Sequence, residues 1–249
     1  AFVLFYATMS AVMENIGVVL VEPKYPENIG AAARCCKNMG IWRLVLVRPH
    51  DLNREKMLKM ATHEAAEIIY GMSVHDSLEE ALSSFNYAVG STARTGRRRR
   101  PTDTPREMAA SVAALSHTNK VALVFGSEKW GLTNEDLCLC QSIVTIPTAG
   151  FSSINLAQSV MILCYEIFAA DIQEPGFKPR LASLKELEAM YEHLKEAFLA
   201  IGLIDPKNPD YWIRNVRRLF ARVELRSREV RLVRGLCRQI LWATGRNRT

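Results

Sequence analysis

The sequence predicts an α/β domain built on a parallel, helix-covered sheet, followed by a small all-helical extension. In the first 170 residues, short runs rich in Val, Leu and Ile alternate with helical patterns. A stretch with two prolines and a glycine follows and indicates a linker. Beyond it, apolar residues recur only at helical spacing. We therefore expect an α/β domain at 14–170, a linker at 171–181 and a helical extension at 182–249.

Residues 1–13 are expected to lie outside this fold. The stretch 1–12 is apolar, but it has no basic flank and no signal-peptide cleavage pattern, and it is too short to span a bilayer. Met9 and Met13 are plausible natural starts. We expect an upstream extension, or a segment foreign to the natural protein. No other stretch has the length and apolar character of a membrane span, so we expect no membrane partner.

Five apolar runs indicate the strands of the sheet. Each run is short, rich in Val, Leu or Ile, and bounded by Gly, Pro or polar residues, which is typical of buried strands. Because helical patterns separate them, the strands are expected to pair in parallel. The runs are 16–21, 42–47, 85–90, 121–125 and 143–146.

Three helices are expected between or after these strands. The first covers 28–39, with Asn28 as a possible N-cap and Gly40 just past its end. The second covers 105–115 and begins with a proline in its first turn. The third is a long apolar helix at 153–170. In the extension, the stretch 184–199 is amphipathic, and apolar residues repeat at helical spacing again within 212–223 and 230–241.

The charge distribution points to a polyanionic partner. The net charge is +6, which alone is compatible with a merely soluble surface. Six arginines lie between Arg94 and Arg106, however, and eleven lie between Arg214 and Arg248, where no lysine and only two acids occur. Two such clusters favour nucleic acid over a solvated basic face.

The cysteines indicate a reduced interior rather than a metal centre. None of the six forms a CxxC pair, and no histidine follows at zinc-ligand spacing. Most lie in apolar stretches. We therefore expect core thiols in a cytoplasmic protein and no structural metal.

Three segments carry patterns that can build a ligand site. PENIGAAAR at 26–34 places small residues at a helix start, where a ligand or a neighbouring backbone can approach closely. FGSEKWGL at 125–132 puts a glycine directly after a strand, where ligands bind in α/β sheets. IPTAGFSSINLA at 146–157 brings hydroxyls and an amide to a helix start. Each pattern also has a structural explanation: a tightly packed helix, a strand-to-helix turn capped by Thr133 or Asn134, and a plain helix cap.

Taken in this order, NxGAxxR, GxExxGL and IP…SxNxA resemble the three motifs of the TrmH-like branch of SPOUT methyltransferases. The stretch VGSTAR at 89–94 matches the loop expected between the first two motifs. Segments at 191–194, 216–222 and 233–236 resemble the helical tail of TrmJ-type tRNA methyltransferases. The resemblance extends over 15–241. Ile154 stands where the family usually has Leu, and the loop before Ser152 is about one residue short, which can alter cofactor affinity.

The resemblance implies a fold, an activity and an assembly. The α/β domain would end in a deep trefoil knot, which general topology rules would not predict, and the protein would be a homodimer. It would transfer a methyl group from S-adenosyl-L-methionine to a ribose 2′-hydroxyl of tRNA, in the anticodon loop. The alternatives are 2′-O-methylation of rRNA and a non-catalytic RNA-binding protein of the same fold.

The resemblance also implies site residues, carried over motif by motif. The cofactor pocket would contain Ser91, Thr92, Ala93, Gly126, Ile146, Ser152, Ser153 and Ile154. The catalytic neighbourhood would contain Asn28, Arg34, Glu128, Ser153 and Asn155. RNA phosphates would contact Arg97, Arg98, Arg99, Arg100, Arg217, Arg218 and Arg222.

We expect Arg34 to orient the substrate phosphate and stabilise the developing alkoxide. It is a poor general base, because a guanidinium stays protonated in proteins. Glu128 or the substrate phosphate would then take the hydroxyl proton. Asn28, Ser153 and Asn155 would orient Arg34 and the cofactor.

Overall fold

The computed structural model describes residues 10–93, 103–170, 178–221 and 223–245. It divides into two compact units, Ala1–Lys178 and Pro179–Thr249. The division falls inside the segment 171–181, where the sequence predicts a linker. Each unit is described by itself.

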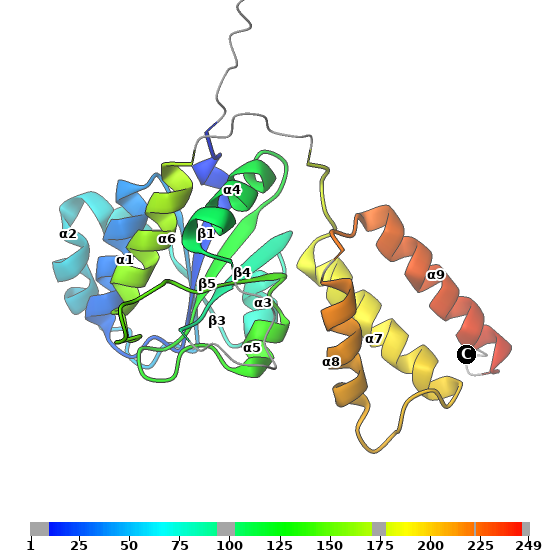
Figure 1. Ribbon diagram of the computed structural model, residues 1–249. Coiled ribbons are helices and arrows are strands. Elements are labelled where there is room, and N and C mark those ends of the chain that lie inside the picture. The colour runs from blue at the N-terminus through cyan, green and yellow to red at the C-terminus, as the bar shows by residue number, and fades with distance from the viewer. Residues whose placement is uncertain (1–9, 94–102, 171–177, 222, 246–249) are drawn as a thin grey trace, which may run out of the picture. The chain divides into compact units, whose positions relative to one another are not determined.

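The first unit is built on a sheet of six parallel strands (Figure 1). Their order is β3-β2-β1-β5-β4-β6. The central strands β1 and β5 are buried along their whole length, as expected for a sheet with helices on both faces. The strands are β1 (Ile16–Val21), β2 (Arg43–Val47), β3 (Ser73–His75), β4 (Tyr87–Ser91), β5 (Val121–Phe125) and β6 (Ser142–Val144).

Helices cover both faces of this sheet. Figure 1 shows α1, α2 and α6 on one side and α3 and α5 on the other. Helix α1 packs against α2 and α6, and α4 packs against α6. The helices are α1 (Pro26–Asn38), α2 (Arg54–Gly71), α3 (Leu78–Leu82), α4 (Pro105–Ser116), α5 (Asn134–Cys138) and α6 (Leu156–Phe168), with a 3-10 turn at Met13–Asn15.

The sheet topology determines where a site can form. Because all six strands are parallel, their carboxyl ends meet at one edge. The chain fills the β1–β2–β3 side first and then returns to build β4, β5 and β6 on the other side of β1. The segments that follow these last three strands therefore emerge close together, next to the point where the strand order reverses.

Two predicted helix starts were wrong. Helix α1 begins at Pro26, with proline at a first-turn position, so Asn28 lies inside the first turn and does not cap it. Helix α6 begins at Leu156 rather than at Ser153, and Asn155 caps it by accepting hydrogen bonds from the amides of Ala157 and Gln158. The side chains of Asn28 and Asn155 both take part in the site described below.

The second unit contains three helices, α7 (Leu184–Ala200), α8 (Pro209–Phe220) and α9 (Ser227–Ala243). Helix α7 packs against both of the others. Its start is fixed by a capping box between Ser183 and Glu186. The apolar core of the unit contains Leu187, Met190, Tyr191, Leu194, Ile213, Val230, Cys237 and Leu241.

Within the described ranges, no helix is both long and apolar enough to cross a membrane.

Candidate active site

A cavity of about 260 Å³ lies at the carboxyl edge of the sheet, beyond the ends of β4, β5 and β6. Three separate segments build its wall, and each follows one of these strands. The structure brings all eight residues of the predicted cofactor pocket to this one cavity: Ser91, Thr92, Ala93, Gly126, Ile146, Ser152, Ser153 and Ile154. The wall also contains residues that the sequence analysis did not assign to the cofactor pocket, most of which lie in the same motif segments: Phe125, Ser127, Lys129, Trp130, Gly131, Leu156 and Ser159.

The turn after β5 explains the two glycines of the GxExxG pattern. A Cβ on Gly126 would lie 2.0 Å from the carbonyl carbon of Gly131, so only glycine lets the chain fold back this tightly. Gly131 has a φ of 63°, and its amide donates a 2.8 Å hydrogen bond to the carbonyl of Ser127. Thr133 then caps α5, so the pattern is a strand-to-helix turn and a cavity wall at once.

A second, more open recess of about 500 Å³ adjoins the cavity. The two hollows share Glu128, Ser153 and Ile154. Four of the five residues expected in the catalytic neighbourhood line this recess, together with Tyr25, Glu27 and Ile154: Asn28, Glu128, Ser153 and Asn155.

A chain of hydrogen bonds joins the three sequence motifs at this recess. The side-chain nitrogen Nδ2 of Asn155 donates to Oδ1 of Asn28 at 3.0 Å. The side-chain nitrogen Nδ2 of Asn28 donates in turn to a carboxylate oxygen of Glu128 at 2.7 Å. Because Asn155 also accepts from two amides of α6, its orientation is fixed at both ends. The chain ties the first turn of α1, the turn after β5 and the start of α6 into one rigid wall.

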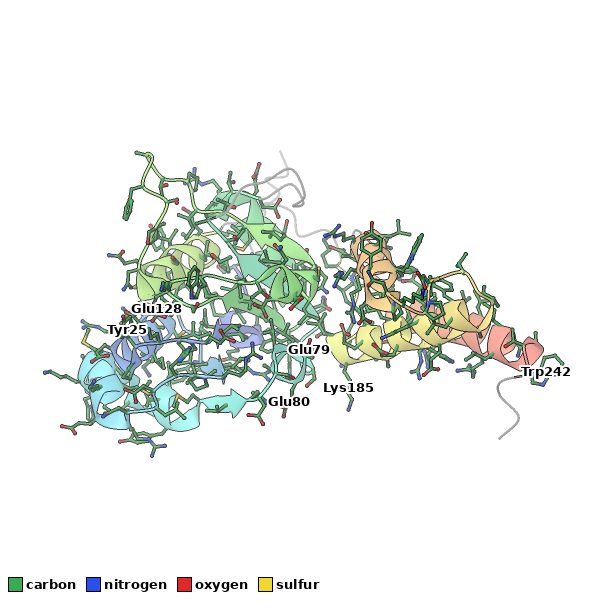
Figure 2. All side chains as sticks on the ribbon, turned by 90° about the horizontal axis from the view of Figure 1, so that it is seen from below. Tyr25, Glu79, Glu80, Glu128, Lys185 and Trp242 are labelled. Atoms are coloured by element: carbon green, nitrogen blue, oxygen red, sulfur yellow. The ribbon has the colours of Figure 1, made fainter. Side chains whose placement is uncertain are left out.

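Glu128 is an anchor for the start of α1. Its carboxylate also accepts hydrogen bonds from the backbone amides of Lys24 at 2.9 Å and Tyr25 at 3.4 Å. Figure 2 shows Tyr25 and Glu128 next to one another. A carboxylate at a helix N-terminus is also stabilised by the helix dipole. Three donors already occupy Glu128, which favours a positioning role over the acceptance of a substrate proton.

Arg34 stands apart from this wall. It is exposed on α1 and lines neither hollow. Its side chain makes no ion pair or hydrogen bond with any residue in the described ranges. Its guanidinium is therefore available to an incoming anion, although no neighbour fixes its orientation.

The arginines expected to bind RNA differ from one another. Arg97, Arg98, Arg99, Arg100 and Arg222 lie outside the described residues. Arg218 is exposed on α8.

Arg217 is instead committed to its own unit. Both of its terminal nitrogens donate to the carboxylate of Glu188, and its guanidinium lies 4.4 Å from the ring centroid of Tyr191. Burial alone would lower the pKa of Arg217, but the hydrogen bonds and charge of Glu188 outweigh it and raise that pKa. This placement favours a structural role for Arg217 over the expected contact with RNA.

Five of the six cysteines are buried, and Cys138 is partly exposed. All six cysteines are free, and Cys35, Cys36 and Cys164 are buried on α1 and α6. Burial raises the pKa of all three thiols, which keeps them protonated. Across the described part of the chain, no group of three or more His, Cys, Asp or Glu side chains is arranged to hold a metal ion.

Comparison with known proteins gives the family of the first unit. Residues 15–165 match the family model described as the SpoU rRNA methylase family. The chain belongs to the SpoU methylase family. The second unit of this SpoU methylase matches a different model, described as the tRNA methyltransferase TrmJ C-terminal domain, over residues 185–249.

Similarity to TrmJ proteins extends over nearly the whole SpoU methylase. It is 38% identical over 240 residues to a tRNA (cytidine/uridine/adenosine-2′-O-)-methyltransferase TrmJ of Pseudomonas aeruginosa, with 90% of this chain and 93% of the relative covered. It is 35% identical over 236 residues to the Escherichia coli tRNA (cytidine/uridine-2′-O-)-methyltransferase TrmJ, with 92% and 96% covered. The crystal structure of TrmJ from Z. mobilis ZM4 superposes with a TM-score of 0.79 at 29% identity, with 90% of this chain and 98% of that chain covered.

The observed parallel sheet and helical second unit agree with the SPOUT fold that the sequence motifs predict. The trefoil knot stays a prediction, because residues 94–102, which follow β4, lie outside the described ranges.

Proposed function

We propose that this SpoU methylase transfers a methyl group from S-adenosyl-L-methionine to a ribose 2′-hydroxyl of tRNA. The observation that carries the proposal is the hydrogen-bonded wall formed by Asn28, Glu128 and Asn155. That wall borders a recess which adjoins the cavity where the predicted cofactor residues converge. The TrmJ relatives, named for tRNA 2′-O-methylation, support the same reaction.

The cavity residues fit S-adenosyl-L-methionine. The wall combines strand-end backbone and small hydroxyls, which can hydrogen-bond a nucleoside, with apolar Ile146, Ile154 and Leu156, which can contact its base. The residues that would hold the cofactor are the eight of the predicted pocket: Ser91, Thr92, Ala93, Gly126, Ile146, Ser152, Ser153 and Ile154. When bound, the cofactor supplies a methyl group activated by a sulfonium.

The chain's own task is mainly to position the acceptor. The leaving group is already activated, so holding the two reactants in line accounts for much of the acceleration. Asn28 and Asn155, fixed by their hydrogen bonds, shape the recess that would hold the acceptor ribose. Ser153 lies on the wall shared by both hollows and can contact either reactant.

Arg34 would stabilise the negative charge that develops during methyl transfer. Its exposed guanidinium can bind a substrate phosphate as a two-pronged donor. Because Arg34 lines neither hollow, it would have to turn toward the recess when RNA binds in order to stabilise negative charge on the attacking oxygen. Glu128 already accepts three hydrogen bonds. The proton is therefore assigned to the substrate phosphate, the other acceptor that the reaction offers.

The second unit favours tRNA over rRNA. The first unit matches a model named for rRNA methylases, but the second matches one named for a tRNA methyltransferase. A non-catalytic RNA-binding role is disfavoured, because the side chains of Asn28 and Asn155 are both present and linked.

The test is to map 2′-O-methyl groups in total RNA from a strain that lacks this gene and from its parent. We expect one or a few tRNA positions, in the anticodon loop, to lose the modification, and the wild-type gene to restore them. Loss confined to rRNA would overturn the choice of substrate. Unchanged RNA would overturn the activity.

We further propose that the protein is a cytoplasmic homodimer. Tyr165 and Phe168 are exposed near the end of α6, an apolar surface that a second copy can cover. Sedimentation analysis of the full chain measures the oligomeric state. A monomer at micromolar concentration would contradict it.

A further inference from the structure

The turn between Gly126 and Leu132 holds an exposed tryptophan at the edge of the cofactor cavity. The turn is closed by the Gly131 amide on the Ser127 carbonyl, and the Trp130 amide donates to the Ser127 hydroxyl at 3.4 Å. The side chain of Trp130 is 63% exposed, yet the residue lines the cavity. A rigid turn that presents a large aromatic surface beside a cavity is typical of ligand contact rather than of core packing.

A lysine accompanies this ring. The ammonium of Lys129 lies 4.6 Å from the ring centroid of Trp130, within cation–π range. Tyr25 lines the neighbouring recess, and the ammonium of Lys24 lies 5.2 Å from the centroid of its ring. Each hollow is therefore lined by an aromatic residue that has a cation beside its ring. These are the two groups that recognise a base and a phosphate in single-stranded RNA.

The side chain of Glu128 connects the turn that carries Trp130 to the segment that carries Tyr25. Glu128 belongs to the same turn as Trp130, and its carboxylate accepts hydrogen bonds from the amides of Lys24 and Tyr25. A nucleotide whose ribose enters the recess beside Asn28 would therefore meet aromatic surfaces that are already in place.

We propose that Trp130 is the platform on which the acceptor nucleobase stacks, with Lys129 beside a flanking phosphate. The inference rests on the proposed function and specifies how its substrate is held. Stacking reads the face of a base and not its hydrogen-bonding edge, so it tolerates different bases. This tolerance agrees with the Pseudomonas aeruginosa relative, whose name includes cytidine, uridine and adenosine.

The 63% exposure of Trp130 is high for an aromatic residue with a purely structural role. Phe151 provides a matched control. It lies in the neighbouring loop and is 81% exposed, but it lines neither hollow.

The experiment compares the full-length wild type with Trp130→Ala, Trp130→Phe and Phe151→Ala. Steady-state methylation of unmodified tRNA gives kcat and KM, and calorimetry gives the Kd for S-adenosyl-L-methionine. We expect Trp130→Ala to lower kcat/KM for tRNA about tenfold, the scale of one lost stack, mainly through KM. The Kd for the cofactor should stay within about twofold, because the ring is assigned to the base. Trp130→Phe should recover most of the loss, and Phe151→Ala should resemble the wild type.

Fluorescence gives an independent readout. Stacking on a base should quench Trp130 when tRNA is added, and that part of the quenching should be absent in Trp130→Phe, whose Trp42, Trp212 and Trp242 remain. Unchanged kcat/KM in Trp130→Ala would overturn the inference. So would a loss of cofactor affinity with KM for tRNA unchanged, which would assign the ring to the cofactor wall. An inactive wild type would instead contradict the proposed function itself.

Discussion

The side-chain amide of Asn155 donates a 3.0 Å hydrogen bond to Oδ1 of Asn28, a residue 127 positions earlier in the chain. The bond connects the cap of α6 to the first turn of α1, and the side chain of Asn28 donates a further hydrogen bond to Glu128. One asparagine thus starts a helix and fixes the wall of the recess, and the two roles can be separated experimentally.

Asn155→Asp should preserve stability and lose activity. An aspartate can still accept from the amides of Ala157 and Gln158, and it caps helices as well as asparagine does. It has no donor for Asn28, however, and it adds a negative charge close to Glu128. We expect an unfolding temperature near that of the wild type and a large fall in methyl transfer.

Asn155→Ala is the matched control, because it removes the cap as well and should cost about 1 kcal/mol of stability. Thermal unfolding and methyl transfer are measured on both variants. An active Asn155→Asp protein would show that the link to Asn28 is dispensable.

Arg34→Ala should abolish methylation with little change in affinity for S-adenosyl-L-methionine, because Arg34 lines neither hollow. Arg34→Lys should also be poor, since an ammonium cannot reproduce a two-pronged contact with phosphate. Single-turnover methylation and cofactor calorimetry check both variants. Turnover near the wild-type value in Arg34→Lys would mean that positive charge alone suffices.

Gly126→Ala should damage the cavity through its backbone. The added methyl would lie 2.0 Å from Gly131 and 2.1 Å from the amide nitrogen of Leu132, so the turn has to open. We expect a loss of stability of about 1–3 kcal/mol, the range for overpacking, together with weaker cofactor binding.

Gly71→Ala provides the control, because a Cβ at Gly71, the last residue of α2, meets nothing within 4 Å. That variant should stay within about 0.5 kcal/mol of the wild type. Denaturant titration and calorimetry measure both proteins. Equal behaviour of the two variants would refute the close-approach explanation of Gly126.

Arg217 and Arg218 should behave differently although they are adjacent. Arg217→Ala leaves Glu188 without its partner and should destabilise the second unit by about 2 kcal/mol, the scale of a hydrogen bond to a charged group. Arg218→Ala should leave stability unchanged, because Arg218 is exposed, and should weaken tRNA binding in a salt-dependent way.

Thermal unfolding and tRNA affinity at two salt concentrations separate the two arginines. If Arg217→Ala were as stable as the wild type but bound tRNA more weakly, Arg217 would have to be counted among the residues that contact RNA.

The central strands could be predicted from the sequence because they are buried on both faces and therefore form continuous apolar runs. The sequence pattern did not predict β3, which is short and lies at the edge of the sheet with exposed Ser73 and Val74. It also did not predict α2, whose periodicity is broken where Thr62 adopts a φ of 63°.

The motifs indicated which residues lie together at one cavity, whereas two helix starts were misplaced. That the cavity residues bind the cofactor stays a prediction. All eight predicted cofactor-pocket residues line one cavity, because the motifs follow adjacent strand ends. The start of α1 was misplaced because Asn28 bonds to Glu128, 100 positions away, and does not cap its own helix. The partner of Arg217 lies 29 positions away, and sequence spacing does not indicate such a pairing. Trp130 stands at a position that the GxExxGL pattern leaves unspecified, so the pattern gave no signal there.

The most direct test of the account uses one tRNA made in two forms. Unmodified tRNA is incubated with the protein and S-adenosyl-L-methionine, and the methylated nucleotide is mapped by mass spectrometry. The same tRNA is then synthesised with a 2′-deoxyribose at the mapped position. We predict that a single ribose is methylated in the first tRNA and that the deoxy form accepts no methyl group. Methyl transfer to the deoxy form, or a methyl group found on a base, would contradict the account.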